Sequence, residues 1–101
     1  LDSFPDNLPL VLKNGQKIPL FEGHATRFTA WVKPITEAST GDLHLRIEDD
    51  GVVRELELPL LSGHWRYVSI PIESQGNTRL SLVGRGEKLL HFELVAASVI
   101  P

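Results

Sequence analysis

Apolar and polar residues alternate along much of the chain with a period of two. The clearest runs lie at residues 28–33, 42–48, 54–58 and 66–72. Such alternation buries one face of a segment and exposes the other, as in the strands of an antiparallel sheet. No segment of similar length has the three-and-four-residue spacing of an amphipathic helix. We therefore predict eight strands, at residues 8–13, 17–22, 25–34, 42–48, 52–60, 65–73, 78–84 and 89–100.

Residues typical of turns separate the predicted strands. Three dipeptides offer the positive φ angles that tight hairpins need: Asn14-Gly15, Asp50-Gly51 and Gly76-Asn77. Three prolines fall inside strand-like runs: Pro19, Pro59 and Pro71. We expect these prolines at sheet edges or bulges, where no ladder N–H is missing. We expect residues 42–48 to pair with 52–60 as a hairpin. The whole pattern predicts one all-β domain over residues 1–101, an antiparallel β-sandwich of jelly-roll type.

Composition supports one folded domain and gives no electrostatic reason to expect nucleic-acid binding. The 101 residues are 42% hydrophobic, which is enough for a single core, and the net charge is −3. No apolar run approaches the roughly 20 residues that span a bilayer, so we expect no membrane insertion. The chain has no Met, even at position 1, and we therefore expect a domain excised from, or processed out of, a larger protein.

We expect no metal site and no cofactor. The chain has no Cys, and its histidines lack the spacing of metal ligands: His24, His44, His64 and His91. Solvated strand histidines are several times more common than ligands, although His44 and His91 could meet across a sheet face. The acidic run at 48–51 fits a hairpin turn better than a calcium-binding loop.

The sequence also disfavours catalysis. Glu55 and Glu57 share one face of a predicted strand, and paired carboxylates roughly 5 to 9 Å apart across a cleft can hydrolyse glycosides. A lone sandwich of this length offers little depth for such a cleft. The chain also lacks a Gly-x-Ser-x-Gly elbow and a phosphate-binding loop. We therefore expect a protein that is not an enzyme.

The alternation places both tryptophans and the only tyrosine on polar faces. A flat ring among hydrogen-bonding side chains suits a sugar, because the ring covers the apolar C–H face while charged groups bind the rim hydroxyls. A structural explanation is also open, in which segment 1–13 covers Trp31 and Trp65 caps an end of the core. The residues that we expect to contact a ligand are Trp31, Tyr67, Arg27, His44, Arg46, Glu48, His91 and Trp65.

Four segments carry a resemblance to a known superfamily. They are Arg27-Phe28-Thr29-Ala30-Trp31-Val32-Lys33, Gly41-Asp42-Leu43-His44-Leu45-Arg46-Ile47, Trp65-Arg66-Tyr67-Val68-Ser69-Ile70-Pro71-Ile72 and His91-Phe92-Glu93-Leu94-Val95-Ala96-Ala97-Ser98-Val99. In this order, residues 25–100 resemble the carbohydrate-binding jelly-roll modules of the galactose-binding-domain-like superfamily. Many of those modules carry an Asp in the closing strand, associated with a structural calcium, where this chain has Leu94-Val95-Ala96. Calcium is therefore possible but disfavoured.

The resemblance implies a glycan site on one sheet face or in loops at one edge. Carried over by position, Trp31 becomes a residue of that face with three cross-strand neighbours: His44, Arg46 and Glu48. Trp65 opens the strand that bears Tyr67. We therefore expect a non-catalytic carbohydrate-binding module of a larger secreted or cell-surface protein, with an oligo- or polysaccharide as partner. The alternative is a structural or protein-interaction sandwich of an adhesin, a phage tail component or a cell-surface enzyme, in which Trp31 and Tyr67 form an interface.

Overall fold

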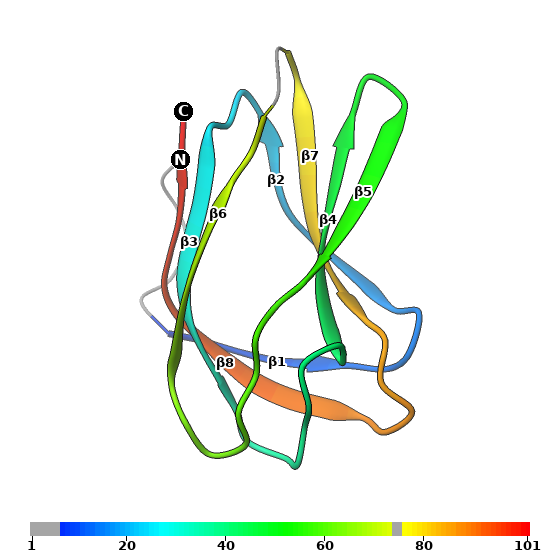
Figure 1. Ribbon diagram of the computed structural model, residues 1–101, viewed down its shortest axis with the longest axis vertical. Coiled ribbons are helices and arrows are strands. Elements are labelled where there is room, and N and C mark those ends of the chain that lie inside the picture. The colour runs from blue at the N-terminus through cyan, green and yellow to red at the C-terminus, as the bar shows by residue number, and fades with distance from the viewer. Residues whose placement is uncertain (1–6, 74–75) are drawn as a thin grey trace.

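The computed structural model describes residues 7–73 and 76–101, which form two four-stranded antiparallel sheets (Figure 1). The strands are β1 (Asn7–Leu12), β2 (Lys17–Gly23), β3 (Arg27–Pro34), β4 (Leu43–Asp49), β5 (Val52–Glu57), β6 (Arg66–Pro71), β7 (Thr78–Gly84) and β8 (Leu90–Ile100). None of the described residues belongs to a helix long and apolar enough to cross a membrane. The predicted β-sandwich with its eight strands is confirmed.

The strands pair in a nested order that gives the fold its topology. β1 pairs with β8, β2 with β7, β3 with β6 and β4 with β5, all antiparallel. Two further pairings, β3 with β8 and β4 with β7, complete a first sheet of order β1-β8-β3-β6 and a second sheet of order β2-β7-β4-β5. Such nesting is that of a long antiparallel ribbon rolled into two facing sheets, which is a jelly roll.

The core lies between the two sheets and is made by the apolar half of each alternating strand. Phe28 of β3 and Phe92 of β8 are fully buried there, opposite Leu45, Leu80 and Leu82 of the second sheet. In β3 the even-numbered residues 28–34 are all buried, whereas the odd-numbered ones are half-buried or exposed. The alternation that predicts the strands therefore has its physical cause in this single shared core.

Most of the turn chemistry is confirmed. Asp50 and Gly51 have φ angles of 48° and 81° and form the two-residue turn between paired residues Asp49 and Val52, as a type I′ hairpin requires. Pro19 lies in edge strand β2 beside a bulge, and Pro71 ends edge strand β6. Pro59 follows β5, which ends at Glu57, so the strand predicted for 52–60 is shorter than expected.

The expectation of a tight hairpin at Gly76-Asn77 is wrong. Neither residue has a positive φ angle, and the segment connects β6 of the first sheet to β7 of the second. A turn that crosses between sheets has no two-residue hairpin geometry to satisfy. The physical reason is the nested pairing, which separates these two consecutive strands.

Candidate functional site

The structure divides the eight predicted ligand-contacting residues between two opposite outer faces. Trp31 and Arg27 on β3, Tyr67 on β6 and His91 on β8 belong to the first sheet, and Trp65 directly precedes β6. The remaining three lie on β4 of the second sheet, where they alternate with the buried residues of that strand: His44, Arg46 and Glu48. One site containing all eight is therefore not formed.

The three β4 residues are not cross-strand neighbours of Trp31, as the sequence led us to expect. β3 pairs with β6 and β8, and β4 pairs with β5 and β7. Both strands bury their apolar faces in the same core, so their polar faces point in opposite directions. For the same reason His44 and His91 do not meet across a sheet face.

The outer face of the first sheet carries an aromatic pair between β3 and edge strand β6. Trp31 lies directly opposite Tyr67, with ring centroids 5.2 Å apart and ring planes inclined by 54°. The amide of Ile72 donates to the carbonyl of Thr26 at 2.9 Å, and counting along the register from that pair makes Trp31 and Tyr67 a pair without backbone hydrogen bonds. Side chains approach most closely at such positions.

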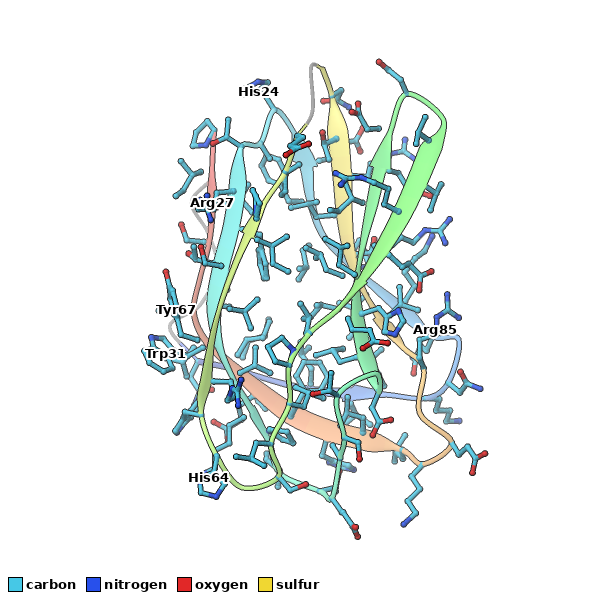
Figure 2. All side chains as sticks on the ribbon, in the orientation of Figure 1. His24, Arg27, Trp31, His64, Tyr67 and Arg85 are labelled. Carbon is cyan, nitrogen blue, oxygen red and sulfur yellow. The ribbon has the colours of Figure 1, made fainter. Side chains whose placement is uncertain are left out.

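Both rings remain accessible to solvent. The exposed fraction is 43% for Trp31 and 54% for Tyr67. Figure 2 shows the two side chains pointing away from the second sheet. The prediction that both residues point outward is therefore confirmed. Segment 1–13 was the alternative cover for Trp31, and its residues 1–6 lie outside the described part of the chain.

A third aromatic residue extends this surface toward one end. Trp65 is 40% exposed, and the Nζ atom of Lys33 lies 5.7 Å from the centroid of its ring. An ammonium group at this distance from an indole is within the range of a cation–π contact. Lys33 therefore lies on the same outward side of β3 as Trp31 and leans toward Trp65.

A cation also lies at the other end of the aromatic pair. The Nη1 atom of Arg27 donates a hydrogen bond of 2.7 Å to the hydroxyl of Ser69 on the neighbouring strand. From Arg27 to Lys33 the strand spans roughly 20 Å, at about 3.4 Å per residue. We call the surface formed by Arg27, Trp31, Lys33, Trp65, Tyr67 and Ser69 the aromatic strip.

His91 lies apart from this strip. It pairs with Val11 of β1, and its amide donates to the hydroxyl of Thr36 at 3.1 Å. Its carbonyl accepts from the amide of Ile35 at 2.8 Å. The backbone of His91 therefore anchors the segment that follows β3.

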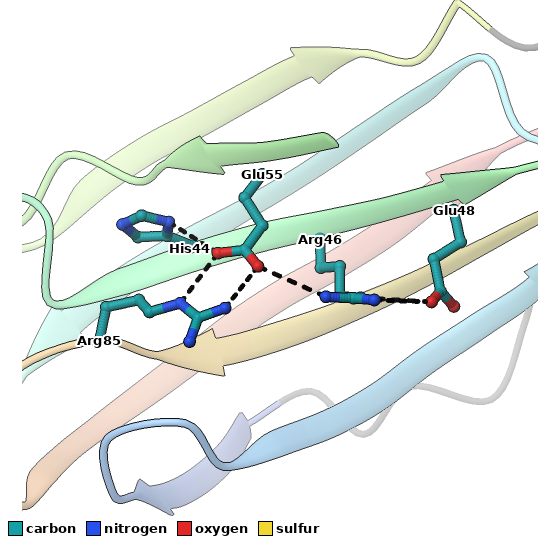
Figure 3. A network of polar contacts seen from close by, with 5 residues as sticks. All are labelled: His44, Arg46, Glu48, Glu55 and Arg85. Carbon is teal, nitrogen blue, oxygen red and sulfur yellow. Dashed lines mark hydrogen bonds and ion pairs between the residues drawn. The ribbon is translucent and has the colours of Figure 1, made fainter. Parts of the chain in front are cut away.

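The polar residues of the second sheet form an ion-pair network around Glu55 (Figure 3). Arg85 Nε donates to Glu55 Oε1 at 2.9 Å, and Arg85 Nη2 donates to Oε2. His44 Nδ1 lies 3.1 Å from Oε1, and Arg46 Nη1 lies 3.5 Å from Oε2. Arg46 also donates to Glu48 Oε1, with its Nη2 at 3.0 Å. The predicted outward residues of β4 are thus engaged with one another and with Glu55 of the neighbouring strand β5.

This network lowers the pKa values of its carboxyl groups. The hydrogen bond from Arg85, opposed by partial burial and helped by His44, lowers the pKa of Glu55 below its ordinary value of 4.5. The hydrogen bond from Arg46 lowers the pKa of Glu48 in the same way. A carboxyl group with a lowered pKa is ionised at neutral pH, so Glu48 and Glu55 are charged opposite their arginine partners.

Four members of these two surfaces were not among the expected site residues: Lys33, Ser69, Glu55 and Arg85. Alternation does place Lys33 and Ser69 on the faces of Trp31 and Tyr67, so their positions could have been found from the sequence. Arg85 lies in the loop after β7 and meets Glu55 only through the pairing of β7 with β4 and of β4 with β5. No local pattern signals such a contact.

No group of three or more His, Asp or Glu side chains that could hold a metal ion occurs within residues 7–73 and 76–101. In comparisons of the chain with models of protein families, with curated proteins and with solved structures, nothing matches.

Proposed function

We propose that this protein is a non-catalytic carbohydrate-binding module and that the aromatic strip is its glycan site. The observation that carries this proposal is the exposed Trp31–Tyr67 pair, whose rings are 5.2 Å apart on one sheet face. Neighbouring exposed apolar side chains that form one patch, rimmed by polar residues, mark binding surfaces more often than scattered ones do. Sugars suit such a surface, because one side of a pyranose ring is apolar and its rim is polar.

The inclination of the two rings favours a chain of sugars over a single flat surface. Because the ring planes differ by 54°, one planar ligand cannot stack on both. Successive sugar units of a glycan rotate about their glycosidic bonds and can present differently oriented faces to Trp31 and Tyr67. The side chains of Arg27, Lys33 and Ser69 then lie near the rim hydroxyls, as orientation requires.

The expected affinity is weak, because the site is open and shallow. A stacked aromatic contact contributes about 0.5 to 1.5 kcal/mol beyond the area that it buries. Two or three such contacts with a few hydrogen bonds correspond to a Kd in the micromolar to millimolar range, roughly −4 to −8 kcal/mol. On a polysaccharide with many repeated units, several such weak contacts can combine and hold the protein at the surface.

A titration of soluble oligosaccharides by isothermal calorimetry and Trp fluorescence tests the proposal. Tyr67→Ala removes one ring of the pair and keeps both tryptophans as reporters, so its fluorescence titration compares directly with that of the unchanged protein. Val53→Ala on the second sheet is the matched control, since Val53 is 47% exposed and far from the strip. We expect binding to be lost with Trp31→Ala and Tyr67→Ala and kept with Val53→Ala. Failure of every oligosaccharide to bind the folded protein contradicts the proposal.

One observation favours the alternative, a protein-interaction sandwich. β6 is an edge strand, and its register makes the backbone amides of Tyr67 and Ser69 point away from β3. An extended partner segment can add to such an edge as a further strand, beside an aromatic contact surface. Light scattering across a concentration range separates the two functions. A concentration-dependent oligomer in which Trp31 fluorescence shifts to the blue supports the alternative.

A further inference from the structure

The two cations of the aromatic strip have no carboxylate partner among residues 7–73 and 76–101. Arg27 donates to the neutral hydroxyl of Ser69 at 2.7 Å, and the ammonium of Lys33 lies 5.7 Å from the ring centroid of Trp65. Glu93 of β8 stands directly opposite Lys33 in the register, yet no ion pair within 4.0 Å joins these two side chains. Within the part of the chain that the structure describes, neither cation of the strip therefore forms an ion pair with a carboxylate.

The outer face of the second sheet is arranged in the opposite way. Arg46 contacts Glu48 at 3.0 Å, Arg79 lies 3.5 Å from Glu22, and Arg85 binds Glu55. The strip differs because β3 and β6 carry no Asp or Glu at all.

The two cations lie on the same side of β3 as Trp31, one toward each end of the aromatic strip. Arg27, Trp31 and Lys33 follow one another on the same side of β3, so each cation is within about 7 to 14 Å of the central ring along the strand. A sugar stacked on Trp31 would direct substituents from its rim toward both ends of the strip. A negative substituent there gains a charge-assisted hydrogen bond that a hydroxyl does not.

From this charge pattern we infer that the aromatic strip selects an acidic glycan, one that carries carboxylate or sulfate groups along its chain. The inference rests on the proposed function and names the class of glycan. Arg27 and Lys33 bind the anionic groups, while Trp31 and Tyr67 stack on the sugar rings between them. The neutral partners Ser69 and Trp65 orient the cations without reducing their charge.

Oligogalacturonates and their fully methyl-esterified forms provide a matched pair of probes that differ in charge but share one backbone. Alginate and heparin-derived oligosaccharides extend the acidic set, and cello-, xylo- and manno-oligosaccharides form a neutral set. Polyglutamate tests charge without sugar rings. We expect at least one acidic glycan to bind more tightly than its neutral counterpart and more tightly than polyglutamate.

Substitution of the cations tests which residues carry the selectivity. Each exposed ion pair contributes roughly two- to fivefold in affinity, so Arg27→Gln and Lys33→Gln should each lower the ratio of acidic-glycan to neutral-glycan affinity by that factor. Lys88→Gln makes the same change of net charge at an exposed loop residue away from the strip and should have no effect. Raising NaCl from about 0.1 M to about 1 M, where the Debye length falls from about 10 Å to about 3 Å, should weaken the acidic glycan selectively.

The outcomes separate this inference from the proposed function. Equal binding of acidic and neutral glycans, or binding of the neutral set alone, overturns the selectivity and leaves the glycan site standing. Acidic binding that survives Trp31→Ala, or that polyglutamate matches, is attraction by charge alone and also overturns the inference. If no oligosaccharide binds the folded protein, the inference and the proposed function both fail.

Discussion

Glu55 and Arg85 form a two-point ion pair that fastens the loop after β7 to edge strand β5. Arg85 Nε lies 2.9 Å from Glu55 Oε1, and Arg85 Nη2 binds Oε2. The amide of Arg85 also donates to the carbonyl of Asp42 at 2.9 Å, which joins the same loop to the segment before β4. Two strands that are not neighbours, β5 and β7, are thus connected across β4 by side chains.

Loss of this pair should destabilise the fold modestly. Glu55→Gln removes the charge that Arg85, Arg46 and His44 share, and we expect the free energy of unfolding to fall by about 1 kcal/mol, since the group is partly exposed. Urea denaturation measures the change. Glu57→Gln is the matched control, because Glu57 lies two residues further along β5 and forms no ion pair among the described residues. Additive effects of Glu55→Gln and Arg85→Gln in a double-mutant cycle would show that the two side chains do not interact in solution.

The carboxylate of Glu55 also makes the stability of the fold depend on pH under acidic conditions. The pKa of Glu55 is lowered in the folded protein, so the unfolded chain binds its proton more readily. The stabilisation is therefore fully present above the ordinary value of 4.5 and is lost as the pH falls through the lowered value. Urea midpoints measured from about pH 7 to about pH 3 should fall more steeply for the unchanged protein than for Glu55→Gln. Parallel curves would contradict this assignment.

The eight strands were predictable because one core imposes one alternation on both sheets. The inward residues of β3 and β4 follow directly from spacing, and Asp50-Gly51 specifies its hairpin through positive φ angles. The end of β5 was misplaced because Leu58 and Leu60 remain buried after the strand ends at Glu57. Burial and strand pairing are separate properties, and periodicity reports only burial.

Close packing at Gly84 should make this position intolerant of any side chain. A Cβ atom there would lie 2.3 Å from the carbonyl oxygen of Lys13, a backbone atom in the turn between β1 and β2. The same turn holds Gly84 by two hydrogen bonds, from Gly15 N to Gly84 O at 2.7 Å and from Gly84 N to Gln16 O at 3.0 Å. Gly84→Ala should therefore cost about 1 to 3 kcal/mol of unfolding free energy.

Gly76→Ala is the control for this prediction. The nearest atom to a Cβ at Gly76 is Asp50 Oδ2 at 3.7 Å, which is an ordinary contact. Alanine also reduces the freedom of the unfolded chain, so we expect Gly76→Ala to leave stability unchanged or slightly raised. If thermal melts show the same loss for both variants, the clash with the Lys13 carbonyl is not the cause.

The candidate site was only partly predictable, because alternation sorts residues by face and not by sheet. It placed Trp31 and Tyr67 outward correctly, 36 positions apart in the chain yet directly opposite in the register. It could not show that His44 and Arg46 belong to the other sheet, since that depends on nested long-range pairing. Strand neighbours are a property of topology, which hydrophobic periodicity does not encode.

The bulge in β8 supplies a last prediction, beside the aromatic strip. Ala96 has a φ angle of 54°, and the pairing with β3 shifts at this point, so that Val95 lies opposite Trp31 and Ser98 opposite Thr29. The sequence carries a trace of the shift, because the buried residues change from even positions, such as Leu94, to the odd position of Val99. Because of the extra residue, Leu94 before the bulge and Val99 after it both face the core.

Glycine should be tolerated at the bulge and not beside it. A left-handed conformation costs an L-residue roughly 1 to 2 kcal/mol, so relief of that strain in Ala96→Gly should offset the greater freedom of glycine in the unfolded chain. Ala97 packs against the core with no positive φ angle, so Ala97→Gly should lose about 1 kcal/mol or more. Chemical denaturation of the two adjacent variants measures the contrast. Equal losses at both positions would mean that Ala96 is not in the left-handed conformation in solution, and the register of Trp31 against β8 would have to be redrawn.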